Sequence, residues 1–261
     1  MSAPRAPAPP LGQGIAGKGV LVTGAVGGIG SAVAHVFAAS GARVAALDLA
    51  EDRASALAAS LPRDGHVGIG ANLADVSRHD ELVAKAEDAV GPLVALAHLA
   101  ALLRRRQDIR EVDEPDWDAQ VDVNLKATFF LNRAFAERLR GAGRPGAIVN
   151  FSSQGWWTGG FGGSVVYNAT KGGIVTMTRG LARTYAAAGI RVNAVAPGLV
   201  DTAMLRDGLS DPVLQGLIDQ VPLGRLASPE EVAPAVVFLT SEHAAYITGA
   251  TLNISGGWLM Y

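Results

Sequence analysis

The chain has 261 residues, of which 49% are apolar and 18% are charged, and this composition predicts a globular protein with a sizeable core. Because the sequence contains no cysteine, it excludes disulfide frameworks, thiolate metal sites and cysteine nucleophiles, so any redox chemistry needs a bound cofactor. The net charge of −2 and the lack of an apolar run of about 18 residues argue against nucleic-acid and membrane partners, and we expect a soluble, cytoplasmic protein.

Residues 1–17 are rich in proline, alanine and glycine, which predicts a flexible N-terminal extension before a single domain at 18–261. A G-x-G-x-x-G match at Gly12, Gly14 and Gly17 falls in this stretch. No helix follows it that could present its N-terminus to a phosphate, so we attribute the match to linker composition.

Short β-branched runs alternate with amphipathic segments along the rest of the chain. The predicted strands are residues 19–23, 43–47, 66–71, 94–99, 147–152, 191–196 and 251–254. The predicted helices, apolar at i, i+3 and i+4, are residues 29–39, 54–60, 77–90, 117–140, 167–188 and 230–241. Strands separated by helices are parallel and covered on both faces, so we expect a single-domain α/β fold of Rossmann type with a doubly wound parallel sheet of about seven strands. Such sheets bind ligands at the carboxyl ends of their strands.

A glycine-rich turn at residues 23–30 follows the first predicted strand and opens the first helix. Glycines permit close backbone approach, and a helix N-terminus offers unpaired N–H groups with partial positive charge, so this context predicts a pyrophosphate site. The alternative is a glycine-rich turn that binds nothing. The residues expected at the cofactor are Gly24, Val26, Gly28, Ile29 and Gly30.

Asp48 lies at the end of the second predicted strand, about 20 residues after the glycine turn. A carboxylate there accepts hydrogen bonds from the hydroxyls of an adenosine ribose, whereas a 2′-phosphate would meet a negative charge with no cation at Val26 or Gly27. Asp48 therefore predicts NAD, with NADP less favoured. Its alternative role is to cap the following helix.

Tyr167 and Lys171 lie four residues apart at the start of a predicted helix, after a strand that ends near Ser152 and Ser153. A phenol with a pKa of about 10 needs about 3 to 4 kcal/mol of phenolate stabilisation to act as a base near neutrality. One ammonium at about 4 Å gives about 4 kcal/mol at an effective dielectric of about 20, so we expect Lys171 to lower the pKa of Tyr167. A serine hydroxyl would hold the substrate oxygen while Tyr167 exchanges its proton, and sequence leaves the choice between the two serines open.

From about residue 18 to residue 257 the chain resembles the short-chain dehydrogenase/reductase family. The family motif T-G-x-x-x-G-x-G matches Thr23, Gly24, Gly28 and Gly30, and the motif Y-x-x-x-K matches Tyr167 and Lys171. The resemblance implies that Asn124 kinks its helix and helps hold a proton-relaying water. It implies a catalytic tetrad of Asn124, Ser153, Tyr167 and Lys171.

The resemblance also implies further cofactor contacts, to which Tyr167 and Lys171 contribute. The segment at 197–202 is similar to the family's P-G-x-V-x-T, which would meet the nicotinamide and phosphates through Pro197, Gly198, Val200 and Thr202. Asn72 and Leu73 would lie at the adenine, and Ala100 at the ribose. One departure is His98-Leu99-Ala100-Ala101, where the family commonly has N-N-A-G, and we expect His98 to be structural.

Three aromatic residues, Trp156, Trp157 and Phe161, lie between Ser153 and Tyr167 and are candidates for contact with the substrate. The alternative is that two of them cover the core of their own loop. Residues 200–223 predict a short helical lid that excludes water. Arginines at 104, 105 and 106 either border the cleft, which would indicate an anionic group, or form a solvated charge run.

These patterns predict an NAD-dependent oxidoreductase that interconverts a secondary alcohol and a ketone by hydride transfer, with Tyr167 as general acid/base. The alternatives are an NADPH-dependent 3-oxoacyl-thioester (acyl carrier protein) reductase and, more remotely, a non-catalytic nucleotide-sensing protein. No two histidines stand at ligand spacing, so no metal site is expected. The resemblance implies a homotetramer, with the tail at 258–261 and the helices that carry Asn124 and Tyr167 at subunit contacts.

Overall fold

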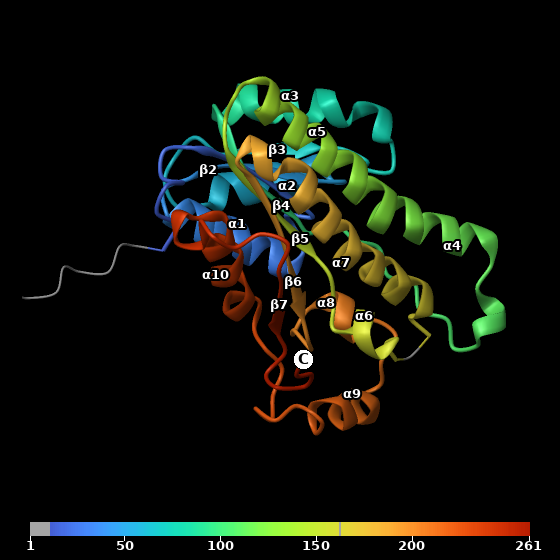
Figure 1. The fold of residues 1–261 in the computed structure, drawn as a ribbon. Helices are drawn as coiled ribbons and strands as arrows, with labels where there is room; N and C mark the ends of the chain where they lie inside the picture. The colour runs from blue at the N-terminus through green and yellow to red at the C-terminus, as the bar shows by residue number, and fades with distance from the viewer. Residues whose placement is uncertain (1–10, 162) are drawn as a thin grey trace, which may run out of the picture.

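A seven-stranded, wholly parallel sheet forms the centre of the protein (Figure 1). The computed structural model describes residues 11–161 and 163–261. The strands run in the order β3-β2-β1-β4-β5-β6-β7. Every predicted strand is confirmed to within one residue at each end, as are the parallel pairing and the single sheet. Their bounds are β1 (Gly19–Thr23), β2 (Arg43–Asp48), β3 (Val67–Gly70), β4 (Leu93–His98), β5 (Gly146–Phe151), β6 (Ile190–Pro197) and β7 (Thr251–Ile254).

Helices cover both faces of this sheet. One layer contains α1 (Gly28–Ala39), α2 (Glu51–Ser60) and α10 (Pro229–Thr240), and the other contains α3 (His79–Val90), α5 (Ala127–Gly141) and α7 (Val165–Tyr185). Within β1, Val20 and Val22 pack into the first layer and Leu21 into the second, all fully buried. Burial on both faces explains why the strands are apolar throughout, without alternation.

The helix predicted over residues 117–140 is interrupted. It consists of α4 (Glu114–Val121), a π-helical turn (Asp122–Lys126) and α5. Asp113 caps α4 by accepting a hydrogen bond from the Asp116 N–H at 2.8 Å. The apolar period does not reveal the π turn, because the extra residue shifts the pattern only locally.

The remaining helices are short. α8 (Ala203–Arg206) and α9 (Asp211–Ile218) occupy the predicted lid at 200–223, where Leu217 and Val221 pack with Leu199 in a small apolar cluster. The others are α6 (Gly155–Thr158) and the 3-10 turns Val76–Arg78, Ile109–Glu111, Ala186–Ala188 and Glu242–Ala244.

The predicted flexible extension was set too long. Ile15 is only 2% exposed and packs in the layer of α1 and α10, and the Gly17 N–H donates to the Gly41 carbonyl at 2.8 Å. Residues 11–17 therefore belong to the domain, because a single apolar anchor within a glycine-rich stretch ties them to the core. Residues 1–10 of the predicted extension lie outside the described residues.

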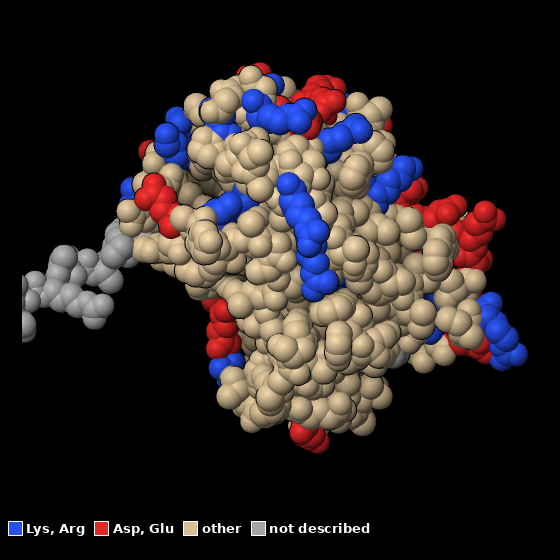
Figure 2. Space-filling view, viewed as in Figure 1, with Lys and Arg blue, Asp and Glu red and all other residues tan. Residues whose placement is uncertain are grey.

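The surface carries charges of both signs. Figure 2 shows acidic and basic side chains interspersed over the upper part of the viewed face and a largely uncharged area in its lower part. Among the described helices, none has both the length and the apolar character required to span a membrane.

Candidate active site

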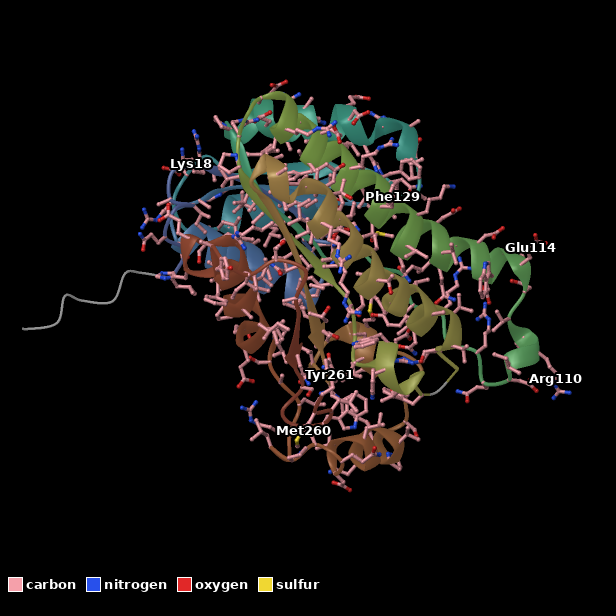
Figure 3. The ribbon with its side chains drawn as sticks, viewed as in Figure 1. Lys18, Arg110, Glu114, Phe129, Met260 and Tyr261 are labelled. Carbon is pink, nitrogen blue, oxygen red and sulfur yellow. The ribbon has the colours of Figure 1, made fainter. Side chains whose placement is uncertain are left out.

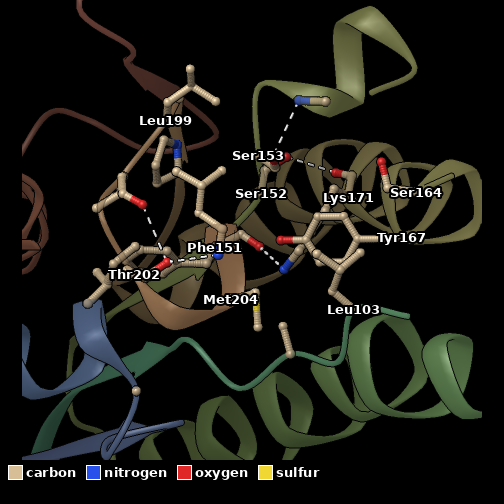
Figure 4. A pocket seen from close by; sticks show the side chains of 18 of the residues that line it. Leu103, Phe151, Ser152, Ser153, Ser164, Tyr167, Lys171, Leu199, Thr202 and Met204 are labelled. Atoms are coloured by element: carbon tan, nitrogen blue, oxygen red, sulfur yellow. Dashed lines mark hydrogen bonds between the residues drawn. The ribbon is translucent and has the colours of Figure 1, made fainter. Parts of the chain in front are cut away.

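The site lies where the strand order reverses. From β1 the chain proceeds outward to β2 and β3, and then returns to β4 on the other side of β1. The loops after β1 and β4 therefore diverge at the carboxyl edge of the sheet and leave a crevice. A cavity of about 270 Å³ opens there, lined by the glycine turn, by residues after β4 and by the segments that follow β5 and β6 (Figure 4).

Backbone geometry requires two of the glycines in the turn. Gly24 has φ +65°, and a Cβ on it would lie 2.7 Å from the Ala100 nitrogen. A Cβ on Gly30 would lie 2.0 Å from the Gly24 carbonyl oxygen. Only glycine therefore permits this tight strand-to-helix connection, which places the N-terminus of α1 at the cavity. A Cβ on Gly28 would lie 2.9 Å from the Thr202 Cγ2 on the other side, so the cradle is narrow and suited to a pyrophosphate.

The Asp48 side chain is hydrogen-bonded to the same turn. Its Oδ2 accepts the Val26 N–H at 3.1 Å and its Oδ1 accepts the Leu49 N–H at 2.8 Å. These bonds hold a carboxylate beside the phosphate cradle, at the carboxyl end of β2. The two features together fit a dinucleotide cofactor.

Tyr167 and Lys171 both line the cavity from the first turns of α7. The Lys171 Nζ lies 5.3 Å from the centre of the Tyr167 ring and donates to the Phe151 carbonyl at 2.7 Å (Figure 4). The two serines differ: the Ser152 hydroxyl donates to the Lys171 carbonyl at 2.9 Å, whereas the Ser153 Oγ accepts the Gly155 N–H at 3.2 Å. Among the described residues nothing accepts the Ser153 proton, so Ser153 is the serine that can donate to a substrate oxygen.

Known proteins match this chain over nearly its whole length, including the residues that line the cavity. A family model described as enoyl-(acyl carrier protein) reductase matches residues 24–259. The chain is 38% identical over 244 residues to a 3-oxoacyl-acyl-carrier-protein reductase of Escherichia coli (strain K12), covering 94% of this chain and 98% of that one. It is 40% identical over 248 residues to D-threitol dehydrogenase of Mycolicibacterium smegmatis, covering 93% of each.

Solved structures agree with this likeness. A crystal structure of a protein assigned as a short-chain alcohol dehydrogenase from Sinorhizobium meliloti 1021 matches with a TM-score of 0.88 at 33% identity, over 95% of this chain and 98% of that one. The chain belongs to the short-chain dehydrogenase/reductase family. It is thus an oxidoreductase that acts on hydroxyl or keto groups, and the resemblance found in its sequence is confirmed.

Within this family architecture, Asn124 holds a loop and does not line the cavity. Its Oδ1 accepts the Leu102 N–H at 2.7 Å, and its Nδ2 donates to the Leu102 carbonyl at 2.8 Å and to the Thr170 Oγ1 at 3.2 Å. The fully buried amide thus ties the loop after β4 to α7 from the π turn. Its part in a water relay stays a prediction.

His98 occupies the position where the sequence departs from the family. Its Nδ1 lies 2.7 Å from the Thr23 Oγ1 and its Nε2 lies 3.0 Å from the Thr128 Oγ1. Burial lowers the pKa of His98 to about 3, with the charge of Lys171 a smaller cause. The imidazole is therefore neutral and joins β1, β4 and α5, which replaces the hydrogen bonding expected of the family's asparagines.

The predicted cofactor residues divide into two groups. Those at the nicotinamide end, Pro197, Gly198, Val200 and Thr202, line the cavity together with Gly24, Gly28, Ile29 and Gly30. Those at the adenosine end do not line it: Val26 and Asp48 are bonded to each other, Asn72 is exposed and accepts the Ala74 N–H at 3.0 Å, Leu73 is buried, and the Ala100 N–H donates to Thr23. The adenine contacts therefore remain predictions.

The acid–base properties of the site differ from the prediction. Burial raises the pKa of Tyr167 to about 12, and the charge that opposes this rise comes from Arg105, not Lys171. Burial also lowers the pKa of Lys171 to about 7. These shifts run against the expectation that Lys171 lowers the pKa of Tyr167, because both groups lose water when the cavity wall encloses them.

The substrate side also differs from the prediction. Phe161 lines the cavity, and its ring centre is 6.1 Å from that of Trp258. Trp156 and Trp157 do not line it, and their ring centres lie 5.5 and 5.7 Å from that of Tyr261. The structure therefore does not bring these two predicted substrate contacts to the cavity. Sequence reasoning missed Trp258, because only the position of β7 beside β6 brings the C-terminal tail to the cavity.

Proposed function

We propose that the protein is an NAD-dependent oxidoreductase that interconverts a secondary alcohol and a ketone, with Tyr167 as general acid/base. One observation carries this proposal: Ser153, Tyr167 and Lys171 line the same cavity as the glycine turn and Thr202. A proton-transfer group and a dinucleotide cradle that share one cavity are suited to removing a proton and a hydride from the same alcohol.

The residues would divide the work as follows. An oxidised nicotinamide held by Pro197, Gly198, Val200 and Thr202 would supply the acceptor for the hydride, with its two electrons, from the carbinol carbon. The Ser153 hydroxyl would donate a hydrogen bond to the substrate oxygen and keep its proton. Tyr167 would remove the hydroxyl proton of the alcohol. A base at Tyr167 needs more positive charge than the protein supplies, and the nicotinamide ring carries such a charge. Lys171, with its pKa lowered to about 7, can pass the proton on near neutrality.

The preference for NAD rests on Asp48. A 2′-phosphate would approach a carboxylate held by Val26 and Leu49, neither of which carries a cation. Like charges at close range cost free energy, so the site favours a free ribose hydroxyl.

A second candidate is an NADPH-dependent 3-oxoacyl-thioester reductase, which the 38% identity to the Escherichia coli reductase favours. The third, a nucleotide sensor without chemistry, is disfavoured because Ser153, Tyr167 and Lys171 all face the cavity. Cofactor preference separates the first two candidates.

A substrate panel tests the proposal. Secondary alcohols with NAD or NADP, and ketones and acetoacetyl thioesters with NADH or NADPH, would be assayed by nicotinamide absorbance. We expect turnover of alcohols with NAD. Turnover restricted to thioesters with NADPH would replace the proposal by the second candidate, and tight cofactor binding without any turnover would replace it by the third.

We further propose a cytoplasmic homotetramer. Trp117 on α4 and Phe129 on α5 are exposed, and so are Met260 and Tyr261 in the tail; Figure 3 shows Phe129 far from these two. Two separate apolar patches suit the two kinds of interface that a dihedral tetramer requires. Light scattering coupled to size exclusion should give four copies, and Phe129→Glu should reduce that number to two.

A further inference from the structure

Three consecutive arginines after β4 have different surroundings. Arg104 Nη1 donates to the Asp116 Oδ1 at 2.7 Å, and the Arg106 Nε donates to the Asp116 Oδ2. The Asp116 side chain is 3% exposed, and hydrogen bonds from these two arginines lower its pKa. One buried carboxylate therefore pairs with both outer arginines, whereas Arg105, between them, lines the active-site cavity.

Arg105 is held in place but lacks an acidic partner. Its Nη1 donates to the Asp207 carbonyl at 3.1 Å, and its guanidinium lies 5.8 Å from the centre of the Phe161 ring. Its Nε is buried and has no hydrogen-bond partner. Among the described residues, no carboxylate oxygen lies within the ion-pair distance of 4.0 Å from the Arg105 guanidinium.

The loop that carries Arg105 is fixed before any ligand arrives. The Arg106 N–H donates to the Gly163 carbonyl at 3.2 Å, and Asn124 holds Leu102 on the other side. A guanidinium on a loop that is held on both sides, with its own bond to the Asp207 carbonyl, loses little conformational entropy when it binds a ligand. The geometry is therefore that of a prepared binding group.

The cavity that Arg105 lines is largely apolar, with Leu103, Leu199, Leu205, Phe161 and Trp258 among its residues. Burial lowers the pKa of Arg105, and the charges of Asp207 and Tyr167 oppose that change. A partly buried cation with a free donor is costly unless an anion pairs with it, and the protein provides none.

We infer that Arg105 binds a carboxylate carried by the substrate, so that the enzyme takes hydroxy acids and oxo acids. This inference rests on the proposed function, because it assigns the substrate class of the same cavity. A guanidinium presents N–H groups in a fork that matches the two oxygens of a carboxylate. One guanidinium without an acidic partner, beside aliphatic and aromatic side chains, fits a singly charged, largely apolar acid better than a phosphate dianion, since Lys171 is already bonded to the Phe151 carbonyl.

Binding of matched acids and esters tests the inference without depending on turnover. The probes are 3-hydroxybutanoate and 3-hydroxycyclohexanecarboxylate, each with its methyl ester, titrated into the full chain with saturating NADH, which cannot accept a hydride from them, and followed by calorimetry. For the wild type we expect at least one acid to bind about 10-fold or more tightly than its ester. Arg105→Gln should remove this preference, and Arg105→Lys should keep part of it.

Arg104→Gln is the matched control, because it removes the same charge from the neighbouring position, outside the cavity, and should leave the acid-to-ester ratio unchanged. Equal binding of acids and esters by the wild type, or an undiminished preference in Arg105→Gln, would overturn the inference. Thermal unfolding checks that each variant folds. If Arg105→Gln does not fold, the comparison of acid and ester binding is made with Arg105→Lys. Parallel turnover assays separate the two proposals: turnover without acid preference removes only this inference, and acid preference without turnover removes only the proposed function.

Discussion

The two ends of the cavity are built from different kinds of atoms. The end at the turn after β1 is formed mainly by backbone, where Gly24 and Gly30 admit a close turn and Asp48 is tied to a main-chain N–H. The end at β5 to β7 consists of side chains from distant segments, among them Phe161 and Trp258. A cradle of backbone atoms can bind the cofactor, which is common to every reaction of this kind. Side chains at the other end can vary with the substrate.

This contrast explains the spread of activities among the relatives. Proteins 38% and 40% identical to this chain are a 3-oxoacyl-acyl-carrier-protein reductase and a D-threitol dehydrogenase. A fold that holds its cofactor through backbone atoms can exchange the side chains at the other end without losing the shared chemistry.

The largest expected effect lies at the junction of the two ends. Tyr167→Phe removes the proton-transfer hydroxyl and little volume, so kcat should fall by about 10³-fold or more while the dissociation constant for NAD changes little. Steady-state kinetics and a cofactor titration measure the two quantities. A variant that keeps a kcat near that of the wild type would show that Tyr167 is not the acid/base.

The cofactor end is tested at Asp48. Asp48→Ser removes the negative charge beside the expected ribose, so the ratio of kcat/KM for NADP to that for NAD should rise by about 10-fold or more. Asp52→Ser, a loss of the same charge from the exposed first turn of α2, serves as control and should leave the ratio unchanged. An unchanged ratio in Asp48→Ser would remove Asp48 from the cofactor site.

The substrate end is tested by two aromatic residues of the same loop. Phe161→Ala deletes part of the cavity wall and should raise KM for an alcohol by about 10-fold, since a lost aromatic contact costs about 1 to 2 kcal/mol. Trp157→Ala removes a larger side chain that packs on Tyr261, outside the cavity, and should leave KM close to that of the wild type. A larger rise in KM for Trp157→Ala than for Phe161→Ala would reverse the assignment.

The smallest effect concerns stability and pH. The pKa of Lys171 is 10.5 in a free side chain and about 7 in the fold, so between these values the unfolded chain binds more protons and stability rises with pH. From about pH 7 to pH 10 the Tm of the wild type should therefore gain several degrees relative to that of Lys171→Met. Calorimetric scans across this range measure the difference, and a constant difference would mean that Lys171 titrates normally.

Motifs within short stretches of chain could be predicted from sequence. The strands, the glycine turn and the Tyr167–Lys171 pair depend on local spacing, and burial on both faces makes each parallel strand a plain apolar run. The family, the fold and the reaction class followed from these features, because the backbone of the turn and the helical spacing carry them.

Only the tertiary structure decided the rest. Ile15 and Trp258 reach their places through contacts with segments distant in the sequence. Arg104 to Arg106 look alike in sequence, although only Arg105 of the three lines the cavity. The pKa of Tyr167 is raised, where the sequence led us to expect that Lys171 lowers it. Burial, which depends on the packing of all neighbouring segments, outweighs the attraction between these two side chains and also lowers the pKa of Lys171.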